Sequence, residues 1–162
     1  MMHINRLKLV LIAIIIIFFQ LFIPVINISG IEFTPDLLII LLTYIGYYYG
    51  RLDAIIIGFL FGLIQDLITQ FELIGIMAFI KSMTGYCLGT LALYQGIWSR
   101  GYRILFIAII FSFHFYLYQF VKLNGTSISN FLFIKIIFFQ VLLPFVILLI
   151  FDKYIMKDGI LK

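Results

Sequence analysis

Ionisable side chains in apolar surroundings are the part of this sequence that could do chemistry. Asp66 closes the apolar segment Gly58-Phe-Leu-Phe-Gly-Leu-Ile-Gln-Asp66, and Lys81 and His114 lie in two further apolar segments. An ionised side chain in hydrocarbon costs about 2.5 to 3.5 kcal/mol even on insertion scales, so each charge needs a partner or a function. Acids, lysines and histidines at membrane depth are also the groups from which proton and ion pathways are built.

We hypothesise that Asp66 and Lys81 form an ion pair. At 1.5 Å per helical residue, they lie about 7 Å and about 12 Å inside the same end of two consecutive antiparallel spans. The alternative is that Asp66 belongs to a proton path, which usually needs further acids or histidines at depth. We favour a structural or partner-binding role for Asp66, and we interpret His114 as a packing residue that hydrogen-bonds to a neighbouring helix.

Enzyme chemistry has little support in the sequence. There is no glycine-rich phosphate loop, no pair of acids with metal-ligand spacing, and no serine or cysteine nucleophile beside a histidine. The chain has two histidines and one cysteine, Cys87, which are too few ligands to indicate a zinc or haem site. We therefore expect a protein that is not an enzyme and that needs no metal or cofactor.

The composition indicates an integral membrane protein. Of its 162 residues, 65% are hydrophobic and only 11% are charged, which is too few polar side chains to cover a water-exposed globule. Apolar stretches fill nearly the whole length, so we expect residues 1–162 to form a single polytopic membrane domain. The net charge of +4 comes from basic residues scattered in ones and twos, which does not indicate a nucleic-acid partner.

The apolar stretches predict an all-α fold with about six transmembrane helices in one compact bundle. The predicted spans are residues 7–26, 35–49, 53–71, 73–93, 102–121 and 130–151. The second span is short, because its fifteen or so residues rise only about 22 Å against a hydrocarbon core of about 30 Å. Two alternatives are open: the span lies shallowly in the membrane, or residues 31–33 extend it as an irregular segment. Thr34, Pro35 and Asp36 supply a capping hydroxyl, a proline suited to the first turn and a favourable acid, so they predict a helix start.

Basic residues predict the orientation of the chain. On one side fall Arg6, Lys8, Arg51, Arg100, Arg103, Lys153, Lys157 and Lys162, whereas Lys122 alone marks the other side. Because cytoplasmic loops carry an excess of Lys and Arg, we expect both termini in the cytoplasm. Aromatic residues collect at the same predicted interface, as in a membrane aromatic belt: Tyr47, Tyr48, Tyr49, Tyr94, Trp98 and Tyr102.

Glycines at a spacing of four predict close helix contacts. Gly58 and Gly62 form one such pair, and Gly85 and Gly89 form another. Together with Asp66 and Lys81, these glycines are our candidate helix-packing or partner-docking residues. We interpret them mainly as packing surfaces within the chain, and docking of a partner's helix stays open.

The order of these elements resembles one family. The matching elements are Pro35-Asp36-Leu37-Leu38, a turn at Gly50, Gly58-x-x-x-Gly62-Leu63-x-x-Asp66-Leu67, Leu73-Ile74-Gly75, and Gly85-Tyr86-x-x-Gly89. They are similar to the rod shape-determining protein MreD family over about residues 34–90. Two features depart from that pattern: the turn at residues 69–72 lacks small residues, and Lys81 is not a family position.

This resemblance implies a non-enzymatic scaffold of the bacterial cell-elongation complex, located in the cytoplasmic (inner) membrane as a multi-pass protein. It implies MreC as the direct partner, MreB, a RodA-type glycosyltransferase and a class B transpeptidase as indirect partners, and contact with membrane lipid. A homodimer stays open. The family is also similar in architecture to the substrate-binding subunits of energy-coupling-factor transporters. The alternative function is therefore a membrane subunit that binds a vitamin-type small molecule.

Overall fold

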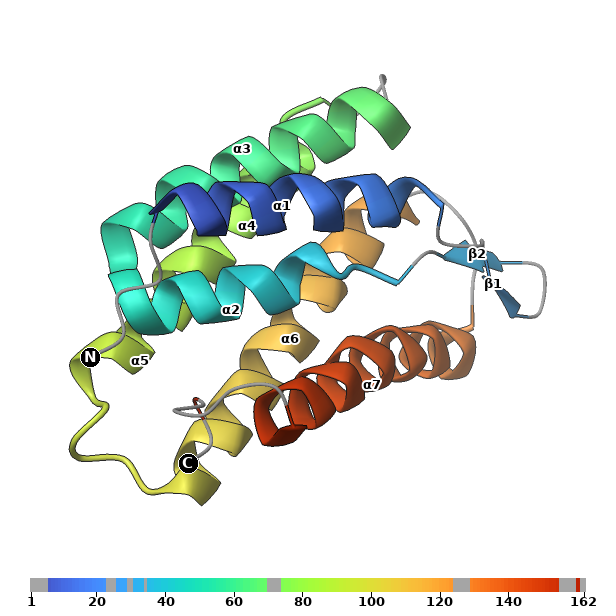
Figure 1. Ribbon diagram of the computed structural model, residues 1–162. Helices are drawn as coiled ribbons and strands as arrows, with labels where there is room; N and C mark the ends of the chain where they lie inside the picture. The colour runs from blue at the N-terminus through green and yellow to red at the C-terminus, as the bar shows by residue number, and fades with distance from the viewer. Residues whose placement is uncertain are drawn as a thin grey trace.

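Helices make up almost all of the described structure. The computed structural model describes residues 6–22, 26–28, 31–33, 35–69, 74–123, 129–154 and 160. The elements are α1 (Arg6–Leu21), β1 (Ile26–Ile28), β2 (Ile31–Phe33), α2 (Leu38–Tyr49), α3 (Arg51–Thr69), α4 (Ile76–Leu88), α5 (Thr90–Leu93), α6 (Arg100–Lys122) and α7 (Asn130–Tyr154). The helices pack side by side in one bundle (Figure 1).

Three described segments are long and apolar enough to cross a membrane, so the chain is a membrane protein. These segments are Ile76–Leu93, which joins α4 to α5, and the helices α6 and α7. Each of the six predicted spans contains a helix, but α1 has only 16 residues and α2 only 12. Six complete crossings therefore remain a prediction.

A two-stranded hairpin between α1 and α2 was not predicted. The strands β1 and β2 are antiparallel, with Ile26 opposite Phe33 and Ile28 opposite Ile31. The predicted first span was therefore wrong at its end, because α1 stops at Leu21 and Ile26 lies in a strand. Isoleucine and phenylalanine suit strands as well as apolar helices, so hydropathy alone does not separate the two.

The start of α2 also differs from the prediction. The helix begins at Leu38, so Pro35 and Asp36 precede it instead of forming its first turn. The Leu38 N–H donates to Asp36 Oδ1 at 3.0 Å, a local side-chain bond that offers the backbone an alternative to helix. Asp36 thus supplies the hydrogen-bond acceptor for the first N–H group of α2. Thr34, the expected capping residue, lies outside the described residues.

The short helix α2 is the core of the bundle. Every residue from Leu38 to Gly46 is buried, and α2 contacts α1, α3, α4, α5 and α7. A helix that is apolar on all sides needs such an enclosed position. Because other helices surround it, α2 need not match the thickness of the membrane.

The helices α3 and α4 form the tightest pair in the bundle. A Cβ atom on Gly62 would lie 2.3 Å from the Ala78 Cα atom, and one on Gly85 would lie 2.4 Å from the Ala54 carbonyl oxygen. Two further glycines make comparable approaches: Gly58 to the Lys81 carbonyl and Gly89 to the Arg51 backbone. The inward faces of these four glycines are therefore filled by the chain itself.

The two ends of the bundle differ in character. At one end, α2 and α7 finish and α3 and α6 begin (Figure 1). This end therefore carries Arg51 and Arg100, the first residues of α3 and α6, and Lys153 in the last turn of α7. We call this the basic end. The opposite end carries β1, β2 and the start of α2, and we call it the hairpin end.

Replacing Gly62 with Ala tests the close packing of α3 on α4. The added Cβ atom meets backbone atoms that cannot rotate away, so the helices must separate. We expect a loss of about 1 to 3 kcal/mol in the free energy of unfolding, measured by denaturant titration in detergent.

The matched control is Gly101→Ala in α6, where nothing lies within 4 Å of the added atom. This control should leave stability unchanged or slightly raised, because alanine has the higher helix propensity. Equal losses for the two variants would contradict close packing at Gly62.

Candidate functional site

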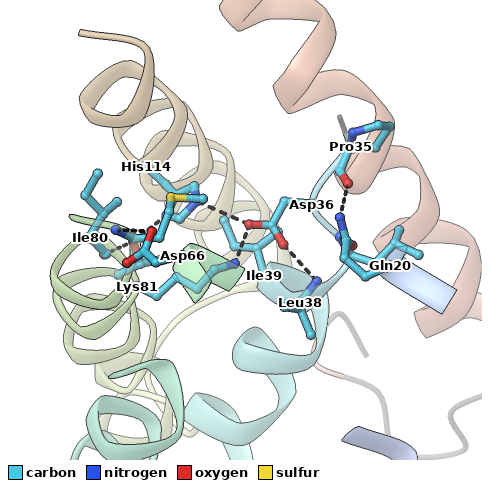
Figure 2. A network of polar contacts seen from close by, with 12 residues as sticks. Gln20, Pro35, Asp36, Leu38, Ile39, Asp66, Ile80, Lys81 and His114 are labelled. Atoms are coloured by element: carbon cyan, nitrogen blue, oxygen red, sulfur yellow. Dashed lines mark hydrogen bonds and ion pairs between the residues drawn. The ribbon is translucent and has the colours of Figure 1, made fainter. Parts of the chain in front are cut away.

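A buried ion pair joins the start of α2 to α4. Lys81 Nζ contacts Asp36 Oδ2, and the two residues are 0% and 2% exposed. Figure 2 shows the Asp36 carboxylate between Lys81 and the Leu38 backbone. The hypothesised ion pair between Asp66 and Lys81 was therefore wrong, because the partner of Lys81 is Asp36.

Asp66 has a different role, as a cap for the neighbouring helix. Its Oδ2 atom accepts hydrogen bonds from the Gly75 N–H at 2.9 Å and the Ala78 N–H at 3.2 Å. Its Oδ1 atom accepts one from the Met77 N–H at 3.2 Å. The first N–H groups of a helix lack partners within the helix and carry partial positive charge, so a carboxylate there is well placed. A side chain of α3 thus caps α4.

His114 brings α6 to the same cluster. Its Nδ1 atom lies 2.9 Å from Thr84 Oγ1 on α4, as expected for a hydrogen bond to a neighbouring helix. Its Nε2 atom lies 3.6 Å from Asp36 Oδ2, a distance too long for a hydrogen bond. Because the Thr84 hydroxyl donates its one hydrogen to the Ile80 carbonyl at 2.7 Å, its oxygen accepts a hydrogen bond from the Nδ1–H of His114.

Gln20 attaches α1 to the segment that carries Asp36. Its Nε2 atom donates to the Pro35 carbonyl at 2.7 Å, and its Oε1 atom accepts from the Leu37 N–H at 2.8 Å. The amide nitrogen and the amide oxygen of Gln20 therefore both form hydrogen bonds, to the residues before and after Asp36. Gln20 was not among the residues predicted from the sequence, although an amide within an apolar stretch is a usable signal.

Two further buried polar contacts were also missed. At the basic end, the Tyr44 hydroxyl donates to Asp152 Oδ1 at 3.2 Å, joining α2 to α7. Between α6 and α7, Gln119 Nε2 donates to Gln140 Oε1 at 2.9 Å, and both glutamines are buried. The first contact joins helices that are distant in the sequence, as the Asp36 cluster does, whereas the second joins consecutive helices.

The cluster contains a hydroxyl, a histidine and an acid in a row, the arrangement of the catalytic triad of many hydrolases. Thr84, His114 and Asp36 follow that order, but each is at most 2% exposed. Asp36 is also engaged by Lys81 and by the Leu38 N–H. Nucleophilic catalysis needs a reacting atom of the substrate beside the hydroxyl, and these buried side chains leave it no access. Within the described residues there is also no group of three or more potential metal ligands.

These features define a helical membrane protein whose buried charges attach its own helices to one another. The family model described as rod shape-determining protein MreD matches residues 1–157. The chain therefore belongs to the MreD family, which confirms the resemblance and gives the protein a role in rod shape determination. No curated protein matches the chain. No solved structure matches it either.

Replacing Lys81 with Met tests the buried ion pair. The variant keeps the side-chain volume but leaves the Asp36 charge without its cation, which costs about 3 to 5 kcal/mol of stability for a buried pair. The double variant Asp36→Asn with Lys81→Met leaves no uncompensated charge, so it should unfold at a denaturant concentration closer to that of the parent.

The control is Lys135→Met on α7, a half-buried lysine for which no ion pair is found among the described residues. It should change stability by less than about 1 kcal/mol. A double variant that loses the sum of both single losses would contradict direct pairing of Asp36 and Lys81.

Two substitutions of Asp66 test its role as a cap. Asp66→Asn keeps one carbonyl oxygen as an acceptor, whereas Asp66→Leu leaves all three backbone N–H groups without their partner. We expect an intermediate loss for Asn and a larger loss for Leu, since each buried donor left unsatisfied costs about 1 to 3 kcal/mol. Unfolding in detergent measures both, with Asp53→Asn in the first turn of α3 as the control. Equal losses for Asn and Leu would argue against the cap.

Proposed function

We propose that this protein is a non-enzymatic scaffold subunit of the bacterial cell-elongation complex that binds MreC within the membrane. Membership of the MreD family supports a role in cell shape. In this proposal MreB, a RodA-type glycosyltransferase and a class B transpeptidase are reached indirectly, through MreC and the rest of the complex.

The observation that carries the proposal is that the buried carboxylates bind groups of the chain's own helices. Asp36 is engaged by Lys81, and Asp66 is engaged by three backbone N–H groups of α4. Ion pathways need ionisable groups that can exchange partners with a moving ion, and these two carboxylates are occupied in holding helices together. That use fits a scaffold better than a carrier or an enzyme.

The outward faces of the helices supply the surface for a partner's span. Gly58, Gly62, Gly85 and Gly89 face backbone of their own chain, so we assign docking to other surfaces. Large apolar side chains point outward on α1 and α7, among them Phe18, Phe19, Phe131 and Phe138. Such faces suit either lipid or the apolar helix of a single-span protein.

We propose a multi-pass arrangement in the cytoplasmic membrane, with both termini in the cytoplasm. The presence of Arg51, Arg100 and Lys153 at the helix ends on this side supports the orientation, since cytoplasmic loops are rich in Lys and Arg. Aromatic stacking at the same end, with Tyr94 and Trp98 ring centroids 4.8 Å apart, fits an interfacial belt.

An N-terminal fusion to green fluorescent protein tests location and partners together. The fusion should fluoresce, because this fluorescent protein matures in the cytoplasm and not after export in unfolded form. Recovery of the fusion from native membranes in mild detergent, followed by mass spectrometry, should yield MreC with a cell-wall synthase.

The control is the same tag on an unrelated polytopic protein. Recovery of transporter ATPases instead would replace the scaffold with the alternative, a vitamin-binding subunit of an energy-coupling-factor transporter. A dark fusion would overturn the orientation, and recovery of neither set of proteins would contradict the scaffold.

A further inference from the structure

The imidazole ring of His114 lies between two hydrogen-bond acceptors. On one side is the Thr84 oxygen, 2.9 Å from Nδ1, whose own hydrogen is donated to the Ile80 carbonyl. On the other side, Nε2 lies 3.6 Å from Asp36 Oδ2, within the range of an ion pair. Figure 2 shows His114 and Lys81 both directed at the Asp36 carboxylate. Both ring nitrogens therefore face acceptors.

This pattern fits the protonated ring. A neutral imidazole has one N–H and one lone pair, whereas imidazolium donates from both nitrogens. A neutral ring with its proton on Nδ1 would direct the Nε2 lone pair at the carboxylate of Asp36, and the two would repel each other. A neutral ring with its proton on Nε2 would require the Thr84 hydroxyl to leave the Ile80 carbonyl. Only imidazolium supplies a hydrogen to each acceptor with that bond intact.

The charges near His114 also favour a proton on the ring. The charged groups that act on His114 are Asp36 and Lys81, and Asp66 of α3 acts in turn on Lys81. Two carboxylates thus face one ammonium group, and each of these side chains is at most 2% exposed. Within the described structure, no charged residue of α7, which also packs on α6, acts on His114. Because a buried net charge is costly, a proton on His114 stabilises the cluster by making it neutral.

We propose that His114 is a proton-binding site, and that the bound proton attaches α6 to the start of α2. The imidazolium Nε2–H points to Asp36 Oδ2, so one carboxylate joins the ring on α6 to the Lys81 ammonium group on α4. Loss of the proton leaves a lone pair facing the carboxylate, which weakens the attachment of α6. The stability of the bundle therefore depends on pH through one histidine. This proposal does not rest on the scaffold function.

Nitrogen-15 NMR of the full-length protein in detergent measures the state of the ring directly. The chain has two histidines, so His3→Gln leaves His114 as the sole source of labelled histidine signals. At about pH 7.5 an ordinary histidine is mostly neutral. We expect the two ring nitrogens of His114 to have nearly equal shifts and to carry a hydrogen each, as in imidazolium. Well-separated shifts, the signature of either neutral form, would overturn the proposal.

The same spectrum of Asp36→Asn, recorded in the His3→Gln background, tests the role of the carboxylate. This variant leaves Lys81 and Asp66 as balanced charges and removes the anion that faces Nε2. We therefore expect a neutral ring. An imidazolium ring in this variant would overturn the attachment to α2, because the proton would then be held without Asp36.

The pH dependence of unfolding in detergent separates proton binding from packing. A proton held by the folded state alone raises the folding equilibrium constant, and this gain falls about tenfold per unit as the pH rises above about 6.5. The parent and the control His3→Gln should show this loss. His114→Gln keeps a polar side chain but binds no proton, so it should not. Equal profiles for all three proteins would overturn the proposal. The NMR measurement leaves His114 in place, so it decides the question even if His114→Gln does not fold.

Discussion

The ion pair between Asp36 and Lys81 is the interaction on which the arrangement of the bundle depends. In hydrocarbon an unpaired charge has no water to solvate it, so neither residue is tolerable without the other. The pair joins the start of α2 to α4, and His114 of α6 approaches the same carboxylate. Gln20 of α1 holds the backbone on both sides of Asp36. Four helices therefore converge around one charged contact (Figure 2).

The glycine contacts between α3 and α4 make this charged contact possible. Gly58 lies against the carbonyl of Lys81, and Gly62 lies against Met77 and Ala78, whose N–H groups are bound by Asp66. A larger residue at position 62 would move α3 away from α4 and draw the Asp66 carboxylate out of hydrogen-bonding range. Asp66 in turn fixes the first turn of α4, one turn before Lys81. Close packing and the polar contacts therefore stabilise each other, and neither feature acts alone.

The sequence predicted the class of protein, the approximate position of each helix and the family, because hydropathy, turn residues and glycine spacing are local signals. It did not predict the partner of Lys81. Sequence proximity favoured Asp66, in the adjoining helix, whereas Asp36 reaches Lys81 only because α2 crosses the pair formed by α3 and α4. The contact of Arg103 with Ile160 was missed for the same reason, since it joins segments far apart in the sequence. The contact of Gln20 was missed because the hairpin that brings Leu37 back to α1 was not predicted. The hairpin was missed because isoleucine and phenylalanine are found in apolar helices as well as in strands, so hydropathy alone does not separate the two.

The length of α2 follows from its position in the bundle. Twelve residues rise only about 18 Å, which would leave a lipid-facing helix too short for the hydrocarbon core. Enclosed by other helices, α2 is fixed by two polar contacts: the ion pair of Asp36 with Lys81 just before its start, and the hydrogen bond of Tyr44, in its middle, to Asp152 of α7. These contacts prevent α2 from sliding along its axis, because a shift would break one of them. Asp152 accepts hydrogen bonds from the Tyr44 hydroxyl of α2 and from the Ile160 N–H, so one carboxylate binds both α2 and the backbone beyond α7. A change at the basic end acts directly on the helix whose other end carries the buried ion pair.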